Sequence, residues 1–457
     1  MKKYDAIIIG AGQAGSPLAK KLALAGRKVA IIEKKWIGGT CINDGCSPTK
    51  TMIASARIAH LTRNGKQWGV ETNEVKINYK TILARKNEIV ASFKGGVTKG
   101  LEKAPNLEII FGDASFINNR QILIKTDDGE IEIEGESIFI NTGCSPSIPD
   151  IEGIKETEYL TSTTLLELEE IPKHLIIVGG GYISLELGQM MSRFGAKVTI
   201  LERGKTLLPK EDDDVCEVIT EVFKKEGIEI HTNAEVTTIS GKQQKKVTAN
   251  IKGKVETFTG SHILIASGRE PQTKNLRLTF AGVETDEKGY IKVDEKLKTT
   301  AQNIYALGDV KGGPAFTQIS YNDFVIVSKN LLEKGKLTTT GRPVPYCIFT
   351  DPQLGRVGLS ETQAKEKGIN YKVAKIPMTN VARALETGET AGYMKAIVDA
   401  DSKQILGAAV LGTEGGEIMS ILQIAMLGNI TYEQLRYNIF AHPLYAESLN
   451  NLFMSFD

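Results

Sequence analysis

The chain of 457 residues has few of the features that mark several classes of protein. No run of apolar residues is long enough to cross a lipid bilayer, which argues against a membrane protein. There are 56 Lys and Arg side chains against 55 Asp and Glu, a net charge of +1, so that no electrostatic attraction to nucleic acid or to a membrane surface is expected. Five cysteines in so long a chain are not those of a secreted disulfide scaffold.

The first residues, MKKYDAIIIGAGQAG, have a basic tip and a short apolar run. The run ends in a glycine-rich turn and not at a cleavage site, which indicates a buried first strand and not a signal peptide. We therefore expect a cytoplasmic protein. At typical domain size, a chain of this length suggests about three domains.

Two segments follow the same order of strand, glycine turn, helix and strand. YDAIIIGAGQAG leads to a strand that ends at Glu33, and HLIIVGGGYIS leads to a strand that ends at Glu202. In dinucleotide-binding domains the first glycine allows a tight turn, the second lets backbone amides approach a pyrophosphate, and the acidic residue binds a ribose. Two such segments predict two dinucleotide-binding domains; the alternative is two similar turns that bind another ligand. The glycines are Gly10, Gly12 and Gly15 in the first segment and Gly179 and Gly181 in the second, where Ser184 replaces the third.

The rest of the chain completes an α/β fold. The segments SIFINTGCSP (137–146) and HILIASGREP (262–271) resemble each other and are expected to close the two nucleotide domains, and NIYALGDV adds a strand that ends at Gly308 and Asp309. Beyond roughly residue 341, strands such as KAIVDAD and a helix around GGEIMSILQIAMLG predict an α+β end domain. The predicted domains are two doubly wound nucleotide-binding domains, residues 1–150 with 271–338 and residues 151–270, and an end domain of residues 339–457.

Cys41 and Cys46 lie close together in IGGTCINDGCSPTK, before a helix that we expect to start near Pro48. In a reducing compartment a close pair of cysteines is more often metal-binding or redox-active than structural. These two can form a disulfide without large backbone movement, and a helix N-terminus favours a thiolate. A structural disulfide or half of a zinc site is the alternative. A zinc site would need a second pair, whereas the other cysteines are scattered singly, so no resident metal is expected.

The whole chain resembles the flavoprotein disulfide reductases, the class I pyridine nucleotide-disulfide oxidoreductases, and most closely their mercuric reductase and dihydrolipoamide dehydrogenase branch. The motifs that carry the resemblance are, in order, GAGQAG, GGTCINDGCSPTK, GGGYISLE, YALGD and FAHPLYAE. It implies FAD on the first nucleotide domain, NAD(P)H on the second, and a homodimer formed through the end domain.

The resemblance also implies a path for electrons from NADH through FAD to a Cys41–Cys46 disulfide and then to a substrate disulfide. It makes Cys46 the thiol beside the flavin and Cys41 the thiol that exchanges with substrate. Lys50 would lie beside the flavin ring and pair with Glu186. The other contacts implied are, for FAD, Glu33, Gly39, Thr40, Ala114, Thr142, Gly143, Asp309 and Thr317, and, for NAD(P)H, Tyr182 as a gate, Ile183, Glu202, Arg203 and Gly268.

Of the five histidines, His442 lies in a motif that suits it to acid–base catalysis. Thiol–disulfide exchange needs a thiolate attacker and a protonated leaving thiol, which a histidine that titrates near neutral pH can supply. His442, in HPLYAE, matches the His-Pro-x-x-x-Glu of the resembling family. Glu447 would orient its imidazole and favour the cationic form. In that family the two residues reach across the dimer to the partner's cysteines.

The nicotinamide coenzyme and the substrate are less well determined by the sequence. Glu202 would accept hydrogen bonds from a ribose 2′-hydroxyl and repel a 2′-phosphate, which favours NADH, while Arg203 leaves NADPH possible. We expect a lipoamide-like or other low-molecular-weight disulfide as substrate. A metal-ion reductase of the mercuric type is the first alternative, although the end SLNNLFMSFD lacks the vicinal cysteines of the mercury enzymes, and those enzymes lack the His-Pro base. The second alternative, a non-catalytic flavin redox sensor, is disfavoured by the intact His442 and Glu447.

Overall fold

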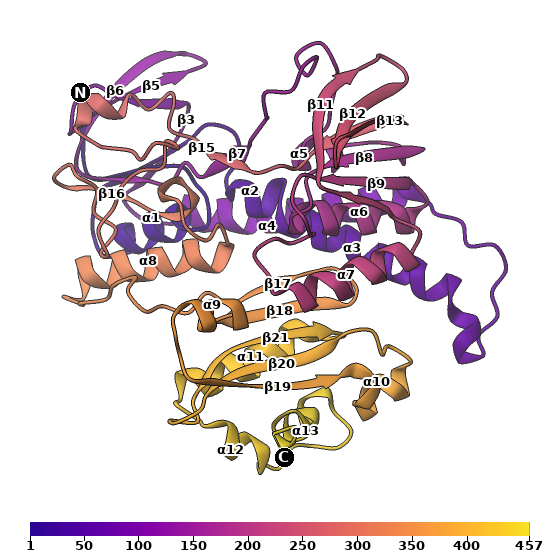
Figure 1. The fold of residues 1–457 in the computed structure, drawn as a ribbon. Coiled ribbons are helices and arrows are strands. Elements are labelled where there is room, and N and C mark those ends of the chain that lie inside the picture. The colour runs from indigo at the N-terminus through magenta and orange to yellow at the C-terminus, as the bar shows by residue number, and fades with distance from the viewer. Residues whose placement is uncertain (457) are drawn as a thin grey trace. The chain divides into compact units, whose positions relative to one another are not determined.

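The computed structural model describes residues 1–456, which divide into two compact units (Figure 1). The first unit contains residues 1–51, 83–147 and 268–342, and the second contains residues 52–82, 148–267 and 343 onward. Two of the boundaries fall inside helices, namely α3 (Cys46–Arg63) and α4 (Tyr79–Glu102). The assignment of an FAD, an NAD(P) and a dimerisation domain stays a prediction.

A parallel sheet forms the centre of the first unit. Its strands run in the order β3 (Leu107–Phe111), β2 (Val29–Glu33), β1 (Lys2–Ile9), β6 (Gly129–Ile140) and β16 (Ile304–Ala306), and β6 continues into antiparallel β5 (Gln121–Thr126) and β4 (Asp113–Phe116). β1 is apolar on both faces because both faces are covered, as parallel sheets require. Helices α1 (Gly15–Leu24) and α8 (Thr317–Leu332) pack side by side on one face, against residues such as Ile8 and Ile31 (Figure 1).

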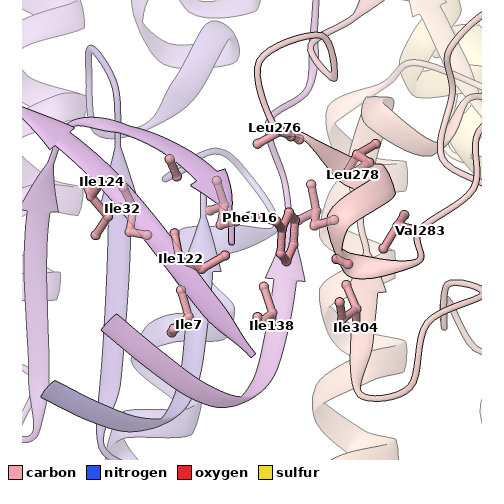
Figure 2. Packing of buried hydrophobic residues seen from close by; sticks show 14 of the residues in the cluster. Ile7, Ile32, Phe116, Ile122, Ile124, Ile138, Leu276, Leu278, Val283 and Ile304 are labelled. Carbon is pink, nitrogen blue, oxygen red and sulfur yellow. The ribbon is translucent and has the colours of Figure 1, made fainter. Parts of the chain in front are cut away.

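The opposite face of this sheet holds a second apolar core. Figure 2 shows Phe116 between the sheet isoleucines, such as Ile122 and Ile138, and the segment that carries Leu276 and Leu278. This packing ties the segment after residue 268 to the N-terminal strands, so that distant parts of the sequence form one core. The shorter elements of the unit are α2 (Gly39–Asn43), β7 (Cys144–Pro146), β15 (Arg269–Pro271), η2 (Leu278–Ala281) and η3 (Gly308–Lys311).

The second unit contains another parallel sheet with a glycine turn. Its order is β10 (Glu229–Thr232), β9 (Lys197–Glu202), β8 (His174–Val178) and β14 (His262–Ile265). Helix α6 (Tyr182–Phe194) follows the turn after β8, and α7 (Asp213–Lys225) leads into β10. An antiparallel sheet of β11 (Ala234–Ser240), β12 (Lys245–Ile251) and β13 (Lys254–Gly260) packs beside it through a shared apolar core. The short elements are η1 (Gly65–Trp68) and α5 (Ser162–Leu165).

The C-terminal part of the second unit is an antiparallel sheet with helices on one face. The strand order is β17 (Tyr346–Ile348), β18 (Gln353–Gly358), β21 (Ile405–Gly412), β20 (Tyr393–Asp399) and β19 (Tyr371–Pro377). Helices α11 (Gly415–Leu427) and α13 (Ser448–Met454) bury its apolar residues. The remaining elements are α9 (Glu361–Glu366), η4 (Met378–Asn380), α10 (Ala382–Thr387), α12 (Tyr432–Arg436) and η5 (Tyr445–Glu447). Two doubly wound sheets and an α+β end part confirm the predicted fold class.

Two local expectations differ from the structure. Helix α3 begins at Cys46 and not near Pro48, which is its third residue. Proline is tolerated there because the first N–H groups of a helix have no partner within the helix. The strand in NIYALGDV ends at Ala306, and Gly308 and Asp309 belong to the single turn η3. Within residues 1–456, no helix combines the length and the apolar character that crossing a bilayer requires.

Candidate active site

The glycine turn after β1 admits no larger residue at its key positions. An ideal Cβ on Gly10 would lie 2.3 Å from the carbonyl oxygen of Asn141, and one on Gly15 would lie 2.1 Å from the carbonyl oxygen of Gly10. Gly39, the first residue of α2, has a φ of +62°, and its Cβ would lie 2.8 Å from the Cα of Gly12. Only glycine fits such contacts. The α1 N-terminus that follows suits an anion such as the pyrophosphate of FAD, so the residues fit this cofactor.

Glu33 and Glu202 occupy equivalent places in the two units. Glu33 accepts a hydrogen bond from the backbone N–H of Ala11 at 2.8 Å, and Glu202 accepts one from the backbone N–H of Gly180. A second bond, from the N–H of Gly204 at 2.5 Å, holds the other oxygen of Glu202. Each carboxylate is therefore fixed beside its glycine turn, with lone pairs left for the hydroxyls of a ribose.

The second unit also contains a cavity of about 340 Å³ that Arg203 helps to line. Its other lining residues are Asn233, Glu235, Asn250, Lys252 and Gly253. Lys252 lies in the turn between β12 and β13, far along the chain from Arg203, so no sequence pattern groups the two cations. Arg203 directly follows Glu202, so these two cations and Glu235 line the space where the adenosine end of a dinucleotide is expected.

The two cysteines of the predicted redox pair lie together in the first unit. Cys41 lies in α2, Cys46 is the first residue of α3, and the thiol of Cys41 is hydrogen-bonded to that of Cys46. The hydroxyl oxygen of Thr317 lies 3.6 Å from the Cys46 sulfur. Thr317 is the first residue of α8, so the N-termini of both α3 and α8 lie at the sulfur pair. The partial positive charge of helix N-termini favours a thiolate.

The proton of Cys41 is held firmly. Its pKa is raised far above the ordinary value, first by the hydrogen bond to Cys46, then by burial and by negative charge on Cys46. A hydrogen bond to Thr317 and the positive charge of Lys50 act in the opposite direction. In this coupled pair the first negative charge therefore makes the second deprotonation unfavourable, so the reduced pair carries one thiolate and one thiol.

Replacing Thr317 by valine tests this coupling. The change keeps the side-chain shape but removes a hydrogen bond that lowers the pKa of Cys41. We expect the thiolate of the reduced pair to form at higher pH than in the wild-type protein, because the variant lacks this hydrogen bond to the sulfur pair. The measurement is the thiolate absorbance of the reduced protein as a function of pH. Thr98→Val, on α4 in the same unit, is the matched control. An unchanged titration in Thr317→Val would remove Thr317 from the account.

The predicted FAD contacts all lie in the first unit. Ala114 is buried on β4, and Thr142 donates from its hydroxyl to the carbonyl oxygen of Gln272 at 2.8 Å. Asp309 lies in η3, and burial raises the pKa of its carboxyl. The contacts that share this unit are Gly10, Gly12, Gly15, Glu33, Gly39, Thr40, Lys50, Ala114, Thr142, Gly143, Asp309 and Thr317. Cys144, which begins β7, is 3% exposed, and its thiol donates to the carbonyl oxygen of Asp309.

The predicted NAD(P)H contacts lie in the second unit with one exception. Gly179, Gly181, Tyr182, Ile183, Glu202 and Arg203 belong to that unit. Gly268 is the first residue of the segment 268–342, which belongs to the first unit, and it directly precedes β15. Glu186 is buried in α6 and accepts a hydrogen bond from the backbone N–H of Phe349 at 2.8 Å. Lys50 and Glu186 belong to different units, so their pairing stays a prediction.

His442 and Glu447 form a pair in the second unit. The Nδ1 of His442 lies 2.9 and 3.1 Å from the two carboxylate oxygens of Glu447. This pairing fixes the ring orientation and directs proton exchange to Nε2. The side chain of His442 is 71% exposed, so the imidazole is accessible from outside its own chain.

The C-terminal part carries apolar side chains that face outward. Ile424 and Leu427, on the outer side of α11, are 64% and 58% exposed, and Ile439 is almost fully exposed. A helix with apolar residues on every side is normally buried. Such a surface is typical of an interface with another chain.

Comparison with known proteins accounts for these features together. The family model described as pyridine nucleotide-disulphide oxidoreductase matches residues 4–323. The model described as the dimerisation domain of pyridine nucleotide-disulphide oxidoreductases matches residues 344–453, which supports a homodimer.

Three relatives share nearly the whole chain. The probable pyridine nucleotide-disulfide oxidoreductase RclA of Escherichia coli (strain K12) is 41% identical over 457 residues, covering 99% of each chain. A solved structure of RclA, as a Cu(II) complex, matches with a TM-score of 0.92 over 99% of each chain. Mercuric reductase of Staphylococcus aureus is 35% identical, covering 99% of this chain and 82% of the relative. Dihydrolipoyl dehydrogenase of Bacillus subtilis (strain 168) is 33% identical, covering 97% and 94%. The chain is therefore a member of the pyridine nucleotide-disulphide oxidoreductases, a family of enzymes that use FAD and NAD(P)H.

Proposed function

We propose that this enzyme uses NADH to reduce a low-molecular-weight disulfide, lipoamide-like or similar, at Cys41 and Cys46. The observation that supports this substrate class is the hydrogen-bonded pair of His442 and Glu447. Disulfide exchange needs a proton donor for the leaving thiol, and an oriented imidazole supplies one near neutral pH. In the proposed dimer, the His442–Glu447 pair of one chain serves the cysteines of the other.

The exchange proceeds in two balanced steps. His442 takes the proton of the Cys41 thiol, the resulting Cys41 thiolate attacks one sulfur of the substrate disulfide, and the first product thiol leaves with that proton from His442. The thiolate of Cys46 then attacks the Cys41 sulfur, which restores the Cys41–Cys46 disulfide and expels the second product as a thiolate that takes a proton from water. Bound FAD would supply the two-electron chemistry that links the nicotinamide to the Cys41–Cys46 disulfide. The helix N-termini at Cys46 and Thr317 favour the single thiolate that the reduced pair carries.

A turnover panel tests the substrate class. Anaerobic NADH oxidation is measured with lipoamide, glutathione disulfide and cystine, and separately with Hg(II) and Cu(II). We expect turnover with at least one disulfide. If no disulfide is reduced, and metal-dependent NADH oxidation persists in excess thiol, the proposed substrate class is wrong.

Reduction of a thiophilic metal ion at the same cysteines is a second candidate. It is favoured by the similarity to mercuric reductase and to RclA, which has been solved as a Cu(II) complex. The reduced pair could deliver one electron to each of two Cu(II) ions, forming the Cys41–Cys46 disulfide and two Cu(I) and releasing the proton of the remaining thiol; thiolates are suited ligands for Cu(I). Trapping of Cu(I) by a specific chelator measures this reaction. Loss of His442 should abolish disulfide exchange and spare metal reduction, which separates the two candidates.

The preference for NADH is a further part of the proposal. We expect Glu202→Gln to raise the KM for NADH about tenfold, because the variant loses a charge-assisted hydrogen bond to the ribose. The same change should lower the KM for NADPH, because it removes a charge that repels the 2′-phosphate beside Arg203 and Lys252. Glu221→Gln, exposed on α7, is the control. Unchanged KM values for both coenzymes would contradict the role of Glu202.

The cytoplasmic location stays a prediction from the sequence.

A further inference from the structure

The two glycine turns differ at one equivalent position. In the first unit β6 lies parallel to β1, and Asn141 follows β6; in the second unit β14 lies parallel to β8, and Ala266 follows β14. An ideal Cβ on Gly10 would lie 2.3 Å from the carbonyl oxygen of Asn141. An ideal Cβ on Gly179 would lie 2.6 Å from that of Ala266. The backbones therefore meet in the same way, and the two units differ in the side chain that follows the strand.

The side chain of Asn141 connects two turns of the first unit. It is 8% exposed, and its Nδ2 donates to the carbonyl oxygen of Gly10 at 3.2 Å. Its Oδ1 lies against Gly308, since a Cβ placed there would be 3.0 Å from this oxygen. The amide thus fills the space between the glycine turn and the turn that carries Asp309. Ala266 has no group that could do the same.

The small residues of the glycine turn leave room for this amide. A Cβ on Gly12 would lie 3.1 Å from the Nδ2 of Asn141, and one on Gly15 would lie 2.8 Å from it. In the second unit the place of Gly15 is taken by Ser184, which is fully buried. The second unit therefore carries a side chain at this position and has no asparagine amide after its strand. The lack of a side chain at Gly15 is therefore what makes room for the amide of Asn141.

The turn at Gly308 is also held from its other side. The N–H of Gly308 donates to the Oδ2 of Asp323 at 2.8 Å. Asp323 is fully buried on α8 and pairs with Arg342 at 2.6 Å and Lys311 at 3.3 Å. The ion pairs thus fix one side of this turn, and the amide of Asn141 adds a side-chain contact between its other side and the glycine turn.

We propose that Asn141 is a positioning residue that holds the two FAD-binding turns, at Gly10 and at Gly308, in place relative to each other, and that it thereby slows the release of FAD between turnovers. The second unit has Ala266 at this position and lacks this side-chain contact, and it exchanges its coenzyme in every turnover. Preorganised contacts slow dissociation because they do not have to be ordered again on binding. This inference rests on the proposed placement of FAD in the first unit.

Release of FAD from the holoenzyme tests the proposal directly. The rise of flavin fluorescence after dilution gives the release rate at a temperature well below unfolding. We expect Asn141→Ala to release FAD about fivefold to tenfold faster, the loss that one buried hydrogen bond represents. The affinity for NADH, measured on the same protein, should stay unchanged. Asn118→Ala, which removes a bond to Gln121 in the turn between β4 and β5, should release FAD at the wild-type rate.

Two further variants make each outcome decisive. Asn141→Ser, which keeps a small polar group but is too short to reach both turns, replaces the alanine variant if that variant yields no holoenzyme. Glu33→Gln removes one carboxylate oxygen at the proposed adenosine ribose and should also speed release. Faster release in Glu33→Gln with wild-type release in Asn141→Ala would overturn the inference and leave the FAD site intact. Wild-type release in both would place FAD elsewhere and overturn both proposals. Equal weakening of FAD and NADH binding in Asn141→Ala would show a general structural role and would overturn the proposed specific role of Asn141 in FAD retention.

Discussion

Replacing Cys46 by serine is expected to reduce turnover of disulfide substrates to the background rate. The variant cannot form the Cys41–Cys46 disulfide, so the product of the first exchange step has no thiolate to resolve it. NADH should still reduce the bound flavin, because that step does not use the sulfur. Anaerobic NADH titration should show loss of the long-wavelength thiolate–flavin absorbance that the wild-type protein develops.

The matched control for this prediction is Cys347→Ser. Cys347 lies on β17 in the second unit, and its thiol donates to the carbonyl oxygen of Ile348. We expect this variant to keep wild-type turnover and the long-wavelength band. Disulfide turnover that survives in Cys46→Ser would show that the pair does not carry the electrons.

Removing the imidazole of His442 is expected to have the second largest effect. His442→Ala should lower disulfide turnover at neutral pH by about 10²–10⁴-fold, the usual contribution of a positioned general acid–base group. The rate at which NADH reduces the flavin should be retained. Glu447→Gln should cause a smaller loss, because it keeps the imidazole but weakens the bond that orients it. Stopped-flow flavin reduction and steady-state disulfide turnover separate the two half-reactions.

The second unit offers a close control for this variant. His231 and Glu229 also form a histidine–carboxylate pair, with 2.8 Å between Nε2 and the carboxylate oxygen. His231→Ala removes an imidazole that also pairs with a carboxylate, without touching the proposed proton donor, so turnover should be unchanged. An equal loss in both variants would point to a general effect on the fold and would contradict a catalytic role for His442.

The parts of the fold that the sequence predicted are those set by local pattern. The apolar run before Gly10 and the acidic residue at Glu33 follow from hydrogen bonding and packing within one strand–helix–strand unit, and the structure shows that unit. The same holds for the segment from Gly179 to Glu202. The helix start at Cys46 was missed because proline is accepted at several positions of a first turn, so the motif alone does not fix the first residue.

The contacts that the sequence did not reveal are made between distant segments. Asn141 and Asp323 look like ordinary strand-end and helix residues, and their contacts with Gly10 and Gly308 depend on the closed sheet. Lys252 joins Arg203 only through the folding of a hairpin. The relation of His442 to the cysteines cannot be read from one chain, because the proposed proton transfer joins two chains.

Counting thiols during an anaerobic NADH titration tests the central claim most directly. If NADH electrons pass to the sulfur pair, the first equivalent of NADH should create two new thiols per chain, while the flavin keeps its oxidised absorbance and gains the long-wavelength band. Bleaching of the flavin by the first equivalent, with no gain in thiols, would contradict the account.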